Sequence, residues 1–360
     1  MEIFVMGAPS LYDEVGEAVP QEGQNLMKAS LFNLVILSQD PERALHCQQL
    51  IDIIIQRFPC RIIFLRADPV GQDFLRTVTG LQMIGTGTNR VYCDQITIEA
   101  APNQLSKVPF LILPHIQADL PIYIVTAHDP SQDGVLLPQI QKYATRLIFD
   151  PENIESFHQF AIRILDFIQS SSGEIVDMNW ARTKAWREAI VRAFSSEESV
   201  RELSTSKMIQ ITFAATPKKQ KSLQEVQAIY LQAWLASRLG WNLVGVEREE
   251  RGWRITYRRD HLATTISLVP KDSDILPPGA VFSFESMTYN DYHFLITHES
   301  ESKFVKVHAS NKERCEMPYS IFLHNYQNGG HLVNEIFYQP LSEHYKAMLE
   351  QLANNLWAKS

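Results

Sequence analysis

Cysteine is scarce in this sequence. Its 360 residues include four cysteines, Cys47, Cys60, Cys93 and Cys315, which lie far apart along the chain. No two of them form a C-x-x-C pair, so the spacing fits neither a structural zinc site nor a thioredoxin-type motif. We therefore expect free thiols in a reducing compartment, and we interpret Cys60 as a buried, inert apolar residue.

Long apolar runs are also absent. The longest candidate, Val108 to Ile116, is interrupted by Pro109, Pro114 and His115. It is therefore much shorter than the stretch of about 20 apolar residues that crosses a bilayer. The first residues lack the basic region and apolar run of a secretory signal. These absences predict a cytoplasmic protein with no membrane partner.

Basic residues are not in excess. The chain carries 33 Lys and Arg against 41 Asp and Glu, a formal net charge of −8. A protein that binds the nucleic-acid backbone needs a positive face. We therefore expect no nucleic-acid partner, although a local basic patch is compatible with this charge balance.

The usual sequence signatures of catalysis are missing. The chain contains no phosphate-binding G-x-x-x-x-G-K-[ST] loop, no G-x-S-x-G elbow and no H-E-x-x-H pair. Gly85-Thr86-Gly87 is followed by Arg90 where a dinucleotide fingerprint has glycine, and the segment before it has a helical rather than a strand pattern. We therefore predict no catalytic, cofactor-binding or metal-binding residues, and we expect the protein not to be an enzyme.

Length and composition favour two globular domains. Apolar residues make up 45% of the chain and charged residues 21%, which is ordinary for a protein with a sizeable core. Ser170-Ser171-Ser172-Gly173 is the strongest linker signal. We predict a loosely ordered N-terminal arm at residues 1–28, an α/β domain at 29–172 and an α+β domain at 173–360.

Strand and helix patterns alternate in the first half, which predicts a largely parallel, Rossmann-like sheet. Leu31 to Leu37 is a continuous apolar run, typical of a strand buried on both faces. Asp40-Pro41-Glu42 marks the start of the helix that follows. The further expected strands are 61–65, 90–100, 120–127 and 146–149, and the further expected helices are 74–83, 105–117, 134–143 and 154–168.

The second half has a different pattern. We expect helices at 178–194 and 197–203, a strand at 208–214, and a long helix at 222–239 that Gly240 ends. About seven short strand-like runs joined by tight turns follow between Trp241 and Phe322. Helices return at 331–337 and 341–357. This pattern predicts an antiparallel sheet covered by helices.

Acidic residues and one histidine directly follow several of the expected parallel strands. In an open α/β sheet, ligands bind beyond the carboxyl ends of the strands. One crevice there would be lined by Asp40, Asp68, His128, Asp129 and Asp150. Aspartate after a strand is also common as a helix cap or turn residue. Both interpretations stay open, and the first would make the protein a module or enzyme that binds a sugar phosphate or nucleotide.

The segment from Asp177 to Phe194 is unusually rich in tryptophan and arginine. Asp177 or Asn179 is suited to cap the start of a helix. An apolar stripe then recurs at helical spacing, and Arg182 lies one turn before Trp186, where its guanidinium can cover the indole. The stripe residues are Trp186, Ile190, Ala193 and Phe194. The segment is either a helix that packs its tryptophans into a core or a recognition surface.

Three segments together resemble the glucose-6-phosphate dehydrogenase assembly protein family (OpcA). The first is the pattern D-x-x-W-x-R-x-x-x-W-R, which begins at Asp177. The second runs from Ala233 to Trp241, and the third combines Asn33 to Leu37 with Phe58 to Ile63. The chain departs from the family where Leu120-Pro121 is followed by Ile122 to Thr126 instead of a pair of tryptophans.

The resemblance implies a non-enzymatic assembly factor or allosteric activator of glucose-6-phosphate dehydrogenase, which serves the pentose phosphate pathway. The residues we expect at the interface with that enzyme are Trp180, Arg182, Arg187 and Arg238. We expect Arg182→Glu to weaken binding while leaving the fold intact. The sequence leaves the oligomeric state open, including a homo-oligomer.

Overall fold

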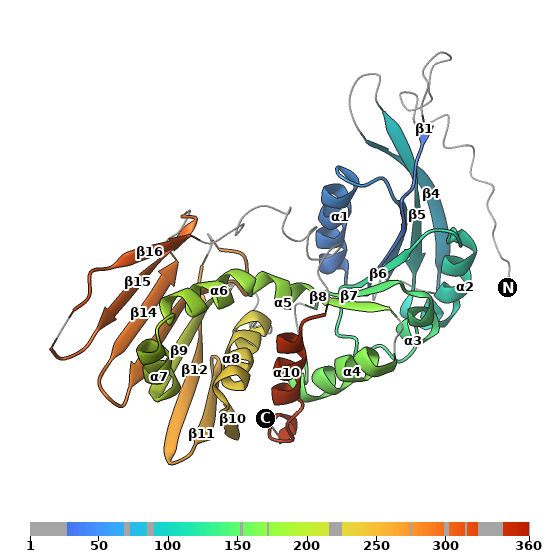
Figure 1. The fold of residues 1–360 in the computed structure, drawn as a ribbon. Coiled ribbons are helices and arrows are strands. Elements are labelled where there is room, and N and C mark those ends of the chain that lie inside the picture. Colours follow the sequence, from blue (N-terminus) through green and yellow to red (C-terminus); the bar gives the residue numbers. More distant parts are fainter. Residues whose placement is uncertain are drawn as a thin grey trace.

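The computed structural model describes residues 27–67, 73–84, 90–151, 154–170, 173–215, 225–273, 276–298, 302–313, 315–322 and 341–359. They form two separate eight-stranded sheets with helices (Figure 1). Sheet A is built from the first half of the chain and is mostly parallel. Sheet B comes from the second half and is mostly antiparallel. The predicted fold class is therefore confirmed.

Sheet A has the strand order β1-β5-β3-β2-β6-β7-β8, with β4 paired to the outer side of β5. Every pairing is parallel except that of β4 with β5. Because β3 and β5 lie to one side of β2, and β6, β7 and β8 lie to the other, the sheet is doubly wound about β2. The bounds are β1 Met27–Lys28, β2 Asn33–Ser38, β3 Arg61–Ala67, β4 Leu75–Ile84, β5 Val91–Ala100, β6 Ile122–Thr126, β7 Arg146–Phe149 and β8 Glu174–Asp177.

Helices cover both faces of sheet A. Helix α1 (Pro41–Ile55) packs on the side chains of Leu34 and Ile36. On the opposite face, Val35 and Leu37 pack in one core with side chains from the other helices of this half. This arrangement explains why the strand sequences are continuously apolar. The other helices are η1 Pro102–Lys107, α2 Val108–Ile112, η2 Leu113–His115, α3 Leu137–Ile140, η3 Gln141–Tyr143 and α4 Phe157–Ser170.

The helix predicted at 74–83 is wrong, because this segment is strand β4. Its residues pair with β5 one for one, from Leu75 opposite Ala100 to Ile84 opposite Val91. Thr77, Val78 and Thr79 are β-branched and suit a strand, and β5 provides a long partner. The predicted helix at 105–117 is in fact the three short helices η1, α2 and η2. The glycine-rich turn predicted at 85–89 lies outside the described residues.

The predicted domain limits at 28/29 and 172/173 stay predictions. Strand β8 lies just past the second limit, yet it pairs with β7 and completes sheet A. Most of the N-terminal arm, the basic loop at 217–221 and the helix expected at 331–337 lie outside the described residues.

Sheet B has the order β10-β11-β12-β9-β13-β14-β15-β16. The seven short strands expected after Trp241 are present, but they do not form one uninterrupted meander. Strand β9 lies in the middle, parallel to β12 and antiparallel to β13. The bounds are β9 Ser206–Ala215, β10 Asn242–Arg248, β11 Trp253–Arg259, β12 Leu262–Asp272, β13 Val281–Thr288, β14 His293–His298, β15 Phe304–Ser310 and β16 Tyr319–Phe322.

Helices α8 and α10 join the two halves. Helix α8 (Val226–Leu239) is buried along most of its length and ends at Gly240, whose φ of 66° gives the predicted left-handed cap. Helix α10 (Glu343–Leu352) packs against both α8 and α4. One core cluster therefore runs from sheet A into sheet B. The remaining helices are α5 Met178–Arg182, α6 Lys184–Ala193, α7 Glu197–Ser204 and η4 Trp357–Lys359.

Candidate functional site

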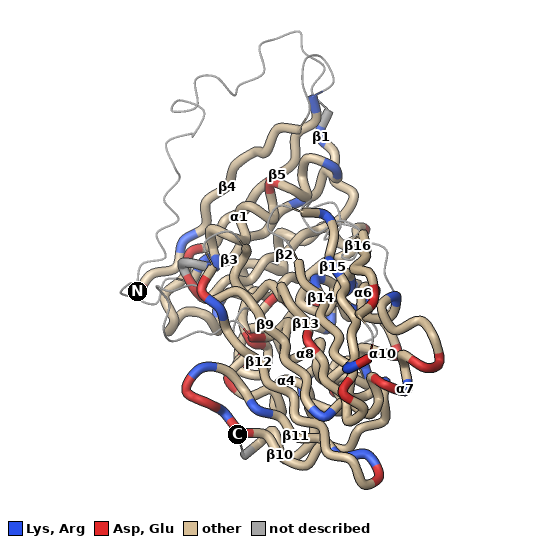
Figure 2. Tube along the Cα trace, turned by 90° about the vertical axis from the view of Figure 1, so that its left-hand side faces the viewer, with Lys and Arg blue, Asp and Glu red and all other residues tan. Residues whose placement is uncertain are grey.

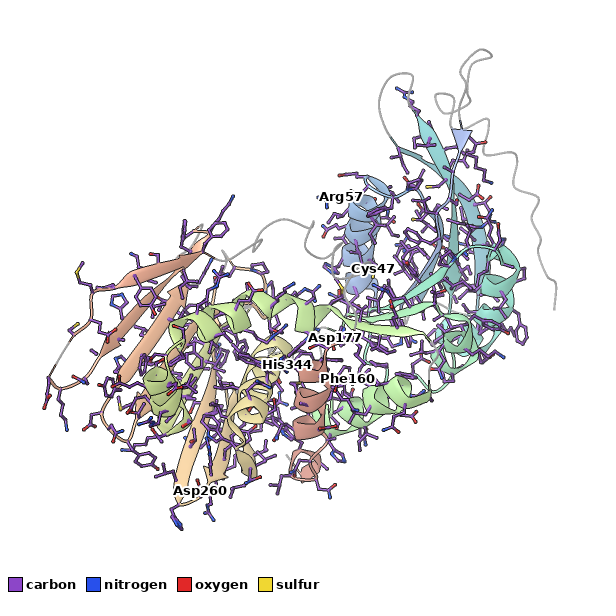
Figure 3. All side chains as sticks on the ribbon, viewed as in Figure 1. Cys47, Arg57, Phe160, Asp177, Asp260 and His344 are labelled. Carbon is purple, nitrogen blue, oxygen red and sulfur yellow. The ribbon has the colours of Figure 1, made fainter. Side chains whose placement is uncertain are left out.

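Asp177 lies at the junction of the two halves, at the end of β8 (Figure 3). Its Oδ1 accepts hydrogen bonds from the backbone N–H groups of Asn179 (2.8 Å) and Trp180 (3.0 Å), so Asp177 is the helix cap. Its Oδ2 accepts from the hydroxyls of Tyr230 on α8 (2.7 Å) and Tyr345 on α10 (2.8 Å). Burial raises the pKa of the Asp177 carboxyl despite these four donors. One carboxylate therefore connects three helices.

The predicted helix at 178–194 is divided at Thr183 into α5 and α6. The Thr183 hydroxyl donates to the Trp180 carbonyl oxygen (2.8 Å), which favours a turn at this point. Along α6 the expected apolar stripe is largely buried, with Trp186 1% exposed. The interpretation of Trp186 as a core residue is therefore confirmed.

Arg182 does not cover Trp186 as predicted. Its guanidinium forms an ion pair with both carboxylate oxygens of Asp150, which follows β7, and its Nη1 also lies 3.2 Å from Asn179 Oδ1. Trp186 points into the core, so its ring is inaccessible to Arg182. The expectation that Arg182→Glu leaves the fold intact therefore needs revision, because the change places a second carboxylate beside buried Asp150.

Arg187, and not Arg182, lies over a tryptophan ring, and that tryptophan is Trp180. The central carbon of its guanidinium lies 3.4 Å from the centre of the indole, and its Nη1 donates to the Trp180 carbonyl oxygen (2.7 Å). Trp180 also contacts Tyr345, whose ring centre lies 5.5 Å from that of Trp180. Trp180 is half-buried as a result. Of the four predicted interface residues, Trp180 and Arg187 are thus in direct contact.

Arg238 is the exposed member of the predicted set. It lies in the last turn of α8, eight residues after Tyr230, and therefore about 12 Å further along the helix. Its Nη1 is 3.5 Å from Nδ1 of His344, which precedes Tyr345 on α10. The predicted residues consequently span α5, α6 and the end of α8, and α10 contacts two of them, Trp180 and Arg238.

Asp150, a member of the predicted crevice, is occupied by internal partners. Besides Arg182, it interacts with Arg43 (3.2 Å) and His46 (3.4 Å) from α1. Burial alone raises the pKa of this carboxyl, but the charges of Arg182 and Arg43 and the hydrogen bonds from His46 and Arg182 outweigh burial and hold it well below its usual value. The negative charge of the Asp150 carboxylate is thus balanced by partners within the fold.

His128 follows β6, beside the end of β2. Its Nε2 lies 3.0 Å from Asp133 Oδ2 and 3.1 Å from Gln39 Nε2, and its Nδ1 is 3.2 Å from the Thr126 hydroxyl. Burial opposes the charge of Asp133, but hydrogen bonding to His128 and its charge lower the pKa of this carboxyl. This group lies where the sheet's winding reverses, the position at which open α/β sheets bind ligands.

The other predicted crevice residues have local roles or lie outside the described residues. The Asp129 carboxylate accepts from the Ser131 backbone N–H and hydroxyl, and burial raises its pKa. The Asp40 carbonyl oxygen accepts from the N–H of Ala44 at the start of α1. Asp68 lies outside the described residues. Within the part of the chain that the structure describes, no group of three or more His, Cys, Asp or Glu residues is placed to hold a metal ion.

The cysteines are free thiols, as predicted, and Cys47, Cys60 and Cys93 are buried. Burial raises the pKa of Cys60 first of all, and the neighbouring Cys93 raises it further, so this thiol is inert at neutral pH. None of the helices in the described residues has the length and hydrophobicity needed to cross a membrane. Figure 2 shows that Lys and Arg positions are interspersed with Asp and Glu positions along the described chain.

Sequence reasoning missed the residues that organise the junction. Tyr345 lies 168 positions from Asp177, and Arg43 lies 107 positions from Asp150. No local pattern links such residues. A weak signal existed in Tyr230, because a tyrosine inside a strongly apolar helix needs a buried hydrogen-bond partner.

The fold and the junction define a two-part protein: a doubly wound α/β half joined through helices to an α+β half. The models for the "Glucose-6-phosphate dehydrogenase subunit" N-terminal and C-terminal domains match residues 52–164 and 173–288, respectively. Together they cover more than half of the chain. The chain belongs to this glucose-6-phosphate dehydrogenase assembly family, OpcA.

Two cyanobacterial relatives bear the name "Putative OxPP cycle protein OpcA". The chain is 23% identical to that of Synechococcus elongatus over 201 residues, which are 55% of this chain and 43% of the relative. It is 24% identical to that of Nostoc punctiforme over 211 residues, which are 57% of this chain and 43% of the relative. The matches thus span less than half the length of these relatives.

Among solved structures, the "putative oxidoreductase yvaA" of Bacillus subtilis aligns with a TM-score of 0.47 at 7% identity, covering 91% of this chain and 98% of that one. The WlbA dehydrogenase of Thermus thermophilus aligns with a TM-score of 0.45 at 9% identity, covering 89% and 94%. At these scores no inference about reaction or cofactor follows.

Proposed function

We propose that this protein is a non-enzymatic assembly factor and allosteric activator of glucose-6-phosphate dehydrogenase, and that it acts in the cytoplasm. The observation that carries the proposal is the match of both halves, in order, to the two domains of the dehydrogenase subunit family. An activator must bind the active state of its target more tightly than the inactive state. We infer that the target's active oligomer is that state.

A non-enzymatic role agrees with how the ionisable groups at the sheet edge are used. Asp150 is held between Arg43 and Arg182, and Asp177 accepts two tyrosine hydroxyls and two backbone N–H groups. Such contacts stabilise a fold and leave these carboxylates without the accessible, poised state that acid–base catalysis needs.

We place the contact surface on the side of the junction that includes Trp180, Arg187 and Arg238, with Arg182 as the residue that supports it. Tryptophan and arginine dominate the energetics of protein interfaces. Arg187 already lies flat on Trp180, so the pair offers a rigid aromatic and cationic surface at little entropic cost. Arg238 adds an exposed charge nearby.

The direct test mixes the protein with the glucose-6-phosphate dehydrogenase of the same organism. Size-exclusion chromatography follows the complex, and absorbance follows NADPH production with and without the protein. Co-elution with a raised rate is expected. Separate peaks with an unchanged rate would reject the proposal.

The contact surface is tested by Arg238→Glu, with Arg57→Glu as the matched control. Both arginines are exposed, and Arg57 lies far from the junction, just after α1 (Figure 3). Reversing an interface charge is expected to weaken binding about tenfold or more, since like charges cost over a kcal/mol at an interface. Equal affinities for the two variants would remove Arg238 from the surface.

A second candidate function rests on the His128 group. This group lies at the point where the winding of sheet A reverses, which is the usual site of nucleotides and sugar phosphates in such folds. A thermal-shift screen with NADP, glucose 6-phosphate and nucleotides tests it, because a ligand of the native state raises the midpoint. A large shift that His128→Ala abolishes would favour a small-molecule module over an assembly factor.

A further inference from the structure

The side chains of sheet B alternate between a covered face and a second face, which we call the bare face. On the covered face, Ile211, Phe284 and Ile296 are fully buried. The strand register aligns the intervening residues in rows across the four central strands on the bare face. These bare-face residues are Thr265, Ser267 and Val269 of β12, Met208, Gln210 and Thr212 of β9, Ser283, Glu285 and Met287 of β13, and His293, Leu295 and Thr297 of β14.

The helices that contact sheet B all lie on its covered face. Phe194, which follows α6, packs on Phe284 and Phe294, and Glu202 of α7 binds Thr288. Gln232 of α8 accepts from the Tyr257 hydroxyl. Figure 1 views the sheet from this helix-covered side. Among the described residues, no helix packs on the bare face.

The centre of the bare face is depleted of charge. Its ionisable residues are Glu285 and His293, and they pair with each other at 2.7 Å. The remaining bare-face residues are uncharged, and Met208 and Met287 are 39% and 37% exposed. Charged side chains surround this centre, with Lys271 near the end of β12, Arg254 and Arg258 on β11 and Lys306 on β15. A charge-poor, methionine-containing centre with a charged rim is the anatomy of a protein interface.

The size of the bare face also matches an interface. Eight strands spaced by about 4.8 Å span about 34 Å, and an average strand of about seven residues extends about 23 Å, which gives roughly 800 Å². Stable complexes bury about 800 Å² on each partner. This area includes the charged rim, and a solvated sheet face has no need for the charge-poor centre that the rim encloses.

We propose that a second copy of this chain packs on the bare face, sheet against sheet, to form a two-fold dimer. A two-fold interface uses the same patch on both copies, so the side chains of the patch must be complementary to those of an identical patch. The centre of the bare face carries no unpaired charge, which allows two copies of net charge −8 to meet there. Two sheets stack about 10 Å apart when medium-sized side chains interdigitate, and Thr, Val, Leu and Met fit this spacing.

The test measures the mass of the isolated protein by light scattering after size exclusion, at micromolar concentrations. The wild-type protein is expected at twice the mass of one chain. Leu295→Arg puts a charge in the centre of the bare face, opposite Glu285, which can pair with it and preserve the fold. This variant is expected at the mass of one chain, with an unchanged circular dichroism spectrum.

The matched control is Leu81→Arg on β4, because Leu81 lies opposite Asp94 in the same cross-strand geometry. It is expected to remain a dimer. Ser267→Arg repeats the test if Leu295→Arg does not fold.

A wild-type protein with the mass of one chain, or two folded bare-face variants that stay dimeric, overturns the proposal. If the wild-type protein has the mass of one chain and the bare-face variants lose binding to the dehydrogenase, the bare face binds the dehydrogenase and not a second copy of this chain. The dimer is measured without the dehydrogenase, so its failure and that of the proposed function are separate.

Discussion

The two sheets of this molecule handle their faces in opposite ways. In sheet A, consecutive residues such as Ile62 and Ile63 are both fully buried, because α1 covers one face and the other helices of that half cover the opposite face. In sheet B, burial alternates along β11, β12, β14 and β15. Sheet A is therefore stabilised from both sides, whereas sheet B, within the part of the chain that the structure describes, is covered by helices on one face (Figure 1).

This difference shows which half is available for partners. A sheet enclosed by helices has no face left for another protein, so contacts of the first half must use loops, helices or the edge strand β4. A sheet with one face outside its own core can dock without unfolding anything. The junction at Asp177 connects the two halves through α5, α8 and α10.

The largest expected effects come from alanine substitutions at adjacent positions in each sheet. Ile62→Ala and Ile63→Ala in β3 are each expected to cost about 3 kcal/mol in the free energy of unfolding, since both leave cavities. In β13, Phe284→Ala is expected to cost about 4 kcal/mol, and its neighbour Ser283→Ala within about 0.5 kcal/mol. Urea unfolding measures all four. Equal costs at positions 283 and 284 would contradict the expected difference between the two faces of sheet B.

Asp150→Asn tests whether the first half depends on its buried ion pairs. The variant keeps the shape but leaves Arg43 and Arg182 without their carboxylate, which is expected to cost about 3 kcal/mol at neutral pH. Because the folded pKa of Asp150 is depressed, its contribution is present above the unfolded pKa of about 3.9 and disappears as the pH falls through the folded value. The difference from wild type should therefore shrink in acid. A pH-independent difference would point to packing instead.

Tyr345→Phe tests the connection between the halves. Losing one hydroxyl donor to a buried carboxylate is expected to cost about 2 kcal/mol at neutral pH. The cost should decrease as the pH is lowered through the raised pKa of Asp177, because the protonated carboxyl depends less on its donors. Tyr230→Phe serves as the matched variant, and the double variant should be non-additive, since both hydroxyls share Oδ2. Strict additivity would mean that the two hydroxyls act separately.

Among the polar contacts, the smallest expected effect is that of Arg187→Lys. Lysine keeps the charge but loses the planar stacking on Trp180, which is expected to cost about 0.5 kcal/mol at this partly exposed site. Thermal unfolding measures the change, with Arg192→Lys, also on α6, as the control. If the variant binds the dehydrogenase as well as wild type does, the stacked pair belongs to the fold alone.

The sequence predicted best what local pattern controls. Strand β2, helix α1 and strand β3 were expected close to their observed bounds, because a buried parallel strand is a continuous apolar run. Strand β4 was missed although its β-branched residues suit a strand, because its partner β5 cannot be identified from the segment alone. The central position of β9 could not be read either, since strand order depends on long-range packing.

The candidate site follows the same division. The cap at Asp177 and the buried position of Trp186 follow from neighbours on one helix. The partner of Arg182 could not be predicted in this way, because Asp150 lies 32 residues away on another element. The expected stacking of Arg182 on Trp186 failed for the same reason: an available long-range carboxylate is a stronger partner than a nearby indole.

The position of α10 has a consequence for how the chain is made. Tyr345 is among the last residues that the structure describes, and it completes the set of donors around Asp177. During synthesis, sheet A and most of sheet B emerge before this helix exists. The two halves are then connected without the contacts of α10, and Asp177 lacks one of its partners. In a ribosome-bound chain, we thus expect the two sheets to form first and to complete their packing against each other only after α10 has been synthesised.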